Sequence, residues 1–104
     1  ALSALLFSCG KDSASIRVAA VIVEAITNEE IPATNAVIKL YQDGELKETA
    51  NTNSAGIITF SKLPKGENWQ VQGSYKLNGI NYNGAATDIK TDGRSASIVS
   101  LKMN

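Results

Sequence analysis

The sequence contains no histidine, and this absence removes several kinds of catalytic and metal site together. Histidine is the usual general base beside a serine or cysteine nucleophile, and it is the commonest protein ligand of transition metals. The chain has one cysteine, so it cannot form an internal disulfide. We therefore expect no catalytic residues, no metal ligands and no cofactor, and we expect that the protein is not an enzyme.

The chain also lacks an excess of either charge. It carries 10 Lys and Arg residues against 10 Asp and Glu residues, and it has no basic run. Proteins that bind nucleic acid need a concentrated positive surface to neutralise phosphates. The carboxylates are scattered, and their spacing brings no two acids to one cleft, as glycoside hydrolysis would need. We therefore expect no nucleic-acid partner.

Long apolar runs are missing as well. The apolar stretch at residues 1–7 is too short to span a bilayer, which takes about 20 residues. It leads into Ser8, Cys9 and Gly10, and the chain turns polar from Lys11. This arrangement resembles the end of a bacterial lipoprotein signal peptide, in which lipid is attached to the cysteine. A free cysteine buried in the core is the alternative.

The lipoprotein resemblance divides the chain into three parts. Residues 1–8 would be the end of the signal peptide, and residues 9–15 would be the lipidated cysteine and a small polar tether. Residues 16–104 would form the folded domain. Acylation of Cys9 implies an outer-membrane lipoprotein on the periplasmic or cell-surface face, held on the membrane by its lipid anchor.

Short alternating apolar segments and regular turn signals dominate the remainder, and no segment has a helical period. Asp43-Gly44 and Asn78-Gly79 are strong signals for two-residue hairpin turns. Residues 27–32 are polar and predict a loop. The pattern predicts an all-β fold, a seven-stranded antiparallel β-sandwich, with strands at residues 16–23, 36–41, 45–51, 57–60, 69–77, 80–86 and 96–103.

The middle of the chain carries a recognisable motif. It begins with alternating apolar residues before a hairpin turn and continues as Thr49-x-x-Thr52-Asn53-x-x-Gly56-x-x-x-Phe60-x-x-Leu63-Pro64-x-Gly66. This motif resembles the prealbumin-like (transthyretin-like) sandwich and is similar to carboxypeptidase regulatory-like and Cna-B-type domains. The resemblance implies a fold rather than an activity, because such modules serve many proteins.

Two aromatic residues are candidates for contact with a ligand or partner. Trp69 and Tyr82 could stack on a sugar or anchor a protein surface. Trp69 shares its strand face with Tyr75, so both rings could instead fill the core, and we favour the core for Tyr75. Tyr82 lies among polar residues and is the better surface candidate.

The sequence thus predicts a non-enzymatic, membrane-anchored lipoprotein. It would act as a structural or accessory binding subunit of a cell-envelope complex at the outer membrane, with a protein partner. One alternative is a fibre or pilus-like subunit that assembles by strand addition, using residues 1–7 if they are retained. Another is a carbohydrate-binding module whose partner is a glycan.

Overall fold

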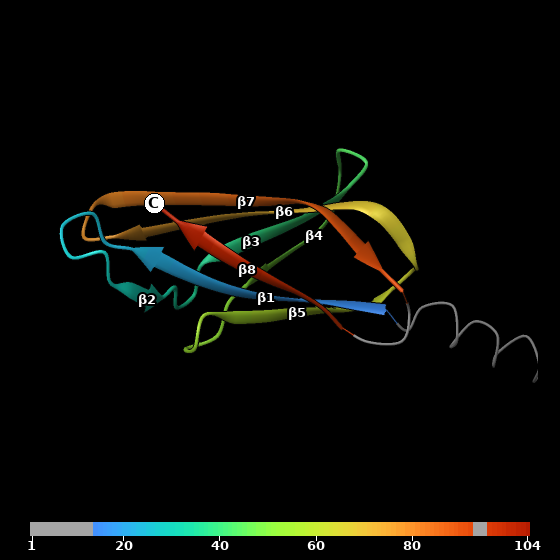
Figure 1. The fold of residues 1–104 in the computed structure, drawn as a ribbon, viewed down its shortest axis with the longest axis horizontal. Helices are drawn as coiled ribbons and strands as arrows, with labels where there is room; N and C mark the ends of the chain where they lie inside the picture. The colour runs from blue at the N-terminus through green and yellow to red at the C-terminus, as the bar shows by residue number, and fades with distance from the viewer. Residues whose placement is uncertain (1–13, 93–95) are drawn as a thin grey trace, which may run out of the picture.

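Two β-sheets face each other across a single core (Figure 1). The computed structural model describes residues 14–92 and 96–104. The described ranges contain no helix. They therefore contain no helix that is long and apolar enough to cross a membrane. Their strands are β1 (Ala14–Val23), β2 (Glu30–Pro32), β3 (Val37–Gln42), β4 (Glu45–Asn51), β5 (Ile57–Leu63), β6 (Gly66–Leu77), β7 (Ile80–Thr91) and β8 (Ala96–Met103). The predicted all-β sandwich is confirmed, with eight strands in place of seven.

The first sheet is built around β1, which is its central strand. One edge of β1 pairs with β8 in parallel, from Ser15 to Ile22. The other edge pairs antiparallel with β5 and then, further along, with β2. The second sheet has the order β4-β3-β6-β7, and all of its neighbours are antiparallel.

The additional strand is β2, which lies in the segment expected to be a polar loop. All three of its residues are exposed, so it has no alternating pattern to recognise. It forms because β5 leaves the edge of β1 at Ala19, and Val21–Val23 remain available for pairing. Pro32 is tolerated there because β2 lies at the edge of its sheet.

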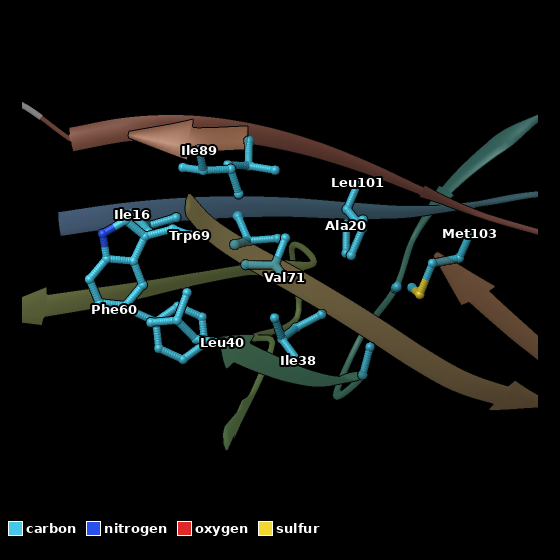
Figure 2. Packing of buried hydrophobic residues seen from close by; sticks show 14 of the residues in the cluster. Ile16, Ala20, Ile38, Leu40, Phe60, Trp69, Val71, Ile89, Leu101 and Met103 are labelled. Carbon is cyan, nitrogen blue, oxygen red and sulfur yellow. The ribbon is translucent and has the colours of Figure 1, made fainter. Parts of the chain in front are cut away.

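The core follows the period-two rule of β-strands. Alternate residues of β1 are buried, beginning at Ala14, two residues before the predicted start of the strand. Figure 2 shows the large apolar side chains pointing into the space between the sheets. The largest fully buried side chains are Trp69, Ile16, Ile38, Leu40, Leu101, Met103, Val18 and Val71.

The residues of the prealbumin-like motif build the turn between β4 and β5. Asn53 Oδ1 accepts hydrogen bonds from the backbone N–H groups of Ala55, at 2.9 Å, and Ile57, at 3.0 Å. Thr52 Oγ1 is buried; it accepts from the Ala36 N–H at 2.8 Å and donates to the Ala33 carbonyl. These hydrogen bonds all join groups of the protein itself, so Thr52 and Asn53 stabilise the turn.

The β6–β7 hairpin has the turn predicted from Asn78-Gly79. Both residues have positive φ, 53° and 80°, as a type I′ turn requires. Asn104, the residue after β8, exchanges backbone hydrogen bonds of 3.3 and 3.2 Å with Asn83 of β7. These two bonds connect β7 of one sheet to the residue after β8 of the other.

Candidate functional site

Trp69 is buried, which corrects its prediction as a contact residue. Its side chain is 1% exposed and belongs to the core cluster, near the end of the sandwich where β1 begins (Figure 2). The reason is strand parity, because Trp69 shares the inward face of β6 with Val71 and Gly73. Its indole Nε1–H has no hydrogen-bond partner in the described part of the protein. Trp69 therefore serves packing.

Tyr82 is half-buried and lies directly across from Tyr75 in the β6–β7 pairing. Both rings pack against the core, in agreement with the core position favoured for Tyr75. Tyr82 also lines two separate surface hollows, one polar and one apolar. It is thus the predicted contact residue that the structure leaves accessible.

The polar hollow lies over the ends of β3, β6 and β7 and has a volume of about 580 Å³. Short amide and hydroxyl side chains supply most of its lining, and Lys76 is its only charged residue. The lining residues are Thr34, Asn35, Val37, Ser74, Tyr75, Lys76, Asn81, Tyr82 and Asn83. Such a surface offers many neutral hydrogen-bond donors and acceptors.

The second hollow, called the apolar groove below, has a volume of about 410 Å³. It lies between the loop that joins β1 to β2 and the β6–β7 hairpin. Its lining residues are Ile22, Glu24, Ala25, Ile26, Ile31, Leu77, Asn78, Ile80 and Tyr82. Ile26, Ile80 and Ile31 are 92, 56 and 38% exposed, an unusual state for three large apolar side chains in one place.

Sequence patterns did not identify this groove. Ile31 lies in the segment expected to be a polar loop, Ile26 directly precedes that segment, and Ile80 is the first residue of β7. The only signal in the sequence was the presence of isoleucine at positions that a solvated loop does not require. The groove exists because the β1–β2 loop and the β6–β7 hairpin come from different sheets and meet at one end of the sandwich.

The groove and the start of β1 lie at opposite ends of the molecule. In Figure 1 the arrowhead of β1 and the β6–β7 hairpin share one end, while the start of β1 lies at the other. Ile22, near the end of β1, lines the groove. The chain therefore enters the sandwich at the end away from the groove.

Cys9, the predicted lipidation site, and residues 1–8 lie outside the described residues. Within the described ranges, no group of three or more Asp, Glu, Cys or His side chains is placed to hold a metal ion.

Comparison with known proteins gives a likeness of structure only. No protein-family model matches the sequence, and no curated protein matches it. Among solved structures, the chain is similar to 5-hydroxyisourate hydrolase of Klebsiella pneumoniae, with 16% sequence identity and a TM-score of 0.45. The match covers 85% of this chain and 96% of the hydrolase chain.

That solved structure is an enzyme, which contradicts the prediction that this protein is not one. The prediction rested on missing residue types and on a fold that serves many roles, and it is withdrawn. At this identity the likeness concerns the course of the chain, and no activity is carried over from the hydrolase. The described part of the chain is a β-sandwich of two packed four-stranded sheets.

Proposed function

We propose that the protein is a membrane-anchored lipoprotein that acts as a structural or accessory binding subunit of a cell-envelope complex. The sequence around Cys9 supports the anchor, because an apolar run ends in a small residue and a cysteine and then becomes polar. Buried acyl chains contribute about 0.8 kcal/mol per CH₂, so two or three chains would hold a small domain on a bilayer. The observation that carries the binding role is the exposed apolar groove at the end of the sandwich remote from the chain's entry.

The length of the tether supports this arrangement. Five Cα–Cα steps separate Cys9 from Ala14, and they can span at most about 18 Å. An acylated Cys9 would keep the start of β1 near the lipid surface. The ten residues of β1 extend about 33 Å further. The apolar groove would then face away from the anchoring membrane, where it is accessible to a protein partner.

Mass spectrometry of the native protein tests the anchor. We expect the mature chain to begin at an acylated Cys9 and to lack residues 1–8. Cys9→Ser should leave the membrane fraction and retain its N-terminal residues, whereas the neighbouring control Ser13→Ala should behave as the wild type. An unmodified, uncleaved N-terminus would contradict the proposal.

Carbohydrate binding is a second candidate, favoured by the polar hollow. Its amide and hydroxyl side chains suit the neutral hydroxyl groups of a sugar, and Tyr75 and Tyr82 also line it. Trp69 no longer supports this candidate, because it is buried.

Calorimetric titration with neutral oligosaccharides tests this candidate. Asn81→Ala and Asn83→Ala should weaken binding, because each removes an amide that lines the hollow. The control Thr87→Ala changes an exposed polar residue of β7 outside the hollow and should have no effect. Equal affinities of all three variants would exclude the polar hollow as the sugar site.

We further infer that the domain is related to the carboxypeptidase regulatory-like and Cna-B-type sandwiches, on the strength of the motif that forms the β4–β5 turn.

The fibre alternative stays a prediction. Every residue of edge strand β4 except Ala50 is exposed, and Glu45 and Lys47 form an ion pair of 3.6 Å on it. Charges on an edge strand oppose the addition of a further strand there.

A further inference from the structure

We propose that the apolar groove binds an apolar segment of a partner protein that carries a lysine or arginine beside its apolar residues. This proposal rests on the accessory-subunit role proposed above and specifies the chemistry of the partner. It concerns the end of the sandwich formed by the β1–β2 loop and the β6–β7 hairpin.

The first observation is the gathering of exposed apolar residues. Five large apolar side chains are exposed in the described ranges, and three of them, Ile26, Ile31 and Ile80, line this one groove. Single exposed apolar residues are ordinary on protein surfaces, but a contiguous group around a hollow marks an interaction site. Ile26 is 92% exposed, so it contributes almost nothing to the protein's own core.

The second observation is that the groove is continuous with the core. Ile22 at its base is 2% exposed, and Leu77 and Tyr82 pack against the core cluster. The groove thus adjoins the core at this end of the sandwich, because a core residue and two residues packed against the core line it. An apolar side chain inserted there would extend the existing core, which favours an aliphatic or aromatic anchor from the partner.

The third observation is the charge at the rim. Glu24 lines the groove, and its backbone N–H donates to the Glu29 carbonyl at 3.0 Å, so both acids belong to the same short loop. The carboxylate of Glu30 is paired with Lys102 at 3.0 Å. No ion pair within the described part of the chain involves Glu24 or Glu29. A lysine or arginine on the partner would complement the carboxylate of Glu24.

The same charges argue against two other occupants. Anionic lipid headgroups would be repelled by Glu24 and Glu29, and the groove lies away from the tethered end. In a symmetric pair of copies the same surface meets itself, which would bring the Glu24–Glu29 loops of both copies together. Like charges facing each other disfavour that pairing.

The test is a nuclear magnetic resonance titration of the full chain with two end-blocked synthetic peptides, Lys-Leu-Val-Leu-Lys and Glu-Leu-Val-Leu-Glu. We expect the lysine peptide to shift the backbone amide signals of Ile26, Ile31 and Ile80. The glutamate peptide should bind about ten-fold more weakly at low salt, and this difference should shrink as salt screens the charges. Shifts that map elsewhere, or equal binding of both peptides, would overturn the proposal.

Matched variants separate the apolar and charged contributions. Ile26→Asn and Ile80→Asn should each weaken the lysine peptide about ten-fold or more, because each removes an apolar contact from an exposed position. Ile98→Asn is the control, since Ile98 is 78% exposed on β8 and does not line the groove. Glu24→Gln should reduce the preference for lysine over glutamate flanks, whereas Glu48→Gln on β4 should not.

Other occupants give distinct results. Self-association of the wild type that Ile26→Asn abolishes would assign the groove to a second copy and overturn the proposal. Binding of the unacylated chain to anionic phospholipid vesicles, lost in Ile26→Asn, would overturn it in favour of a lipid surface. An unacylated native Cys9 would contradict the anchor alone, because peptide binding by the full chain does not require lipid.

Discussion

A Cβ atom placed on Gly56 would lie 2.5 Å from the carbonyl oxygen of Ala20, closer than real Cβ contacts come. The Ala20 N–H donates to the Gly56 carbonyl at 2.8 Å, so the two backbones are held directly against each other. Gly56 also has a φ of +78°, in the region that side chains disfavour. The β4–β5 turn therefore packs on the middle of β1 through a position that only glycine can occupy.

Gly56→Ala should destabilise the domain by more than about 3 kcal/mol, because it combines backbone strain with a backbone clash. Urea unfolding followed by circular dichroism measures this change. Gly44→Ala is the control, since Gly44 has a φ of +82° but nothing within 4 Å of its added Cβ. Gly44→Ala should lower the free energy of unfolding by only about 1 kcal/mol, through backbone strain. Equal losses in the two variants would show that the close approach to Ala20 has no effect.

Thr52→Val should lower the free energy of unfolding by about 1–3 kcal/mol, since the buried Ala36 N–H loses its acceptor and the Ala33 carbonyl loses its donor. The size and shape of the side chain are nearly unchanged, so packing contributes little. Thr49→Val on the exposed face of β4 should change stability by less than about 0.5 kcal/mol. Chemical denaturation of both variants makes the comparison, and similar values for both would contradict the role assigned to Thr52.

The fluorescence of Trp69 should respond to the packing of the core rather than to ligand binding. We expect its fluorescence emission to lie at short wavelength and to resist quenching by acrylamide, because the ring is 1% exposed. Oligosaccharides should leave the spectrum unchanged. Trp69→Ala should destabilise the domain by about 3–5 kcal/mol through the cavity that it leaves. Emission at long wavelength with easy quenching would place the ring at the surface and refute this assignment.

The ion pair between Lys102 of β8 and Glu30 of β2 should contribute little to the free energy of unfolding. Its N–O distance is 3.0 Å, but both side chains are at least half exposed. A double-mutant cycle with Lys102→Met and Glu30→Gln should give a coupling below about 1 kcal/mol that falls with added salt. A larger coupling energy that persists at high salt would contradict this expectation. It would mean that the ion pair, which joins β2 to β8 over β1, stabilises the position of β2.

The strands could be predicted where the sequence alternates or where a turn demands special residues. Asn78-Gly79 has the backbone that its sequence predicts, and Asn53 makes the turn bonds expected of its motif. The short β2 could not be predicted, because its three exposed residues carry no pattern and its pairing depends on where β5 ends. The parallel pairing of β8 with β1 is likewise a long-range choice that no local pattern encodes.

The candidate site was harder to predict than the fold. An aromatic residue on an alternating strand can face either way until the sheet has a partner, so the sequence left the face of Trp69 open, whereas the polar neighbours of Tyr82 favoured the surface. The packing of the two sheets buried Trp69 and left Tyr82 between two hollows. Ile26 and Ile80 are far apart in the chain, and only the meeting of a loop with a hairpin makes them neighbours.

The sequence alone determined the all-β class, most strand positions, and the turns built on Asn-Gly and Asp-Gly. These properties are local, because they depend on residue type, period and backbone preference. Tertiary structure decided which face of each strand is buried, that β2 exists, and that an apolar groove opens at the end of the sandwich away from the start of β1. These depend on contacts between distant segments, whose free energy is gained only once both sheets have packed.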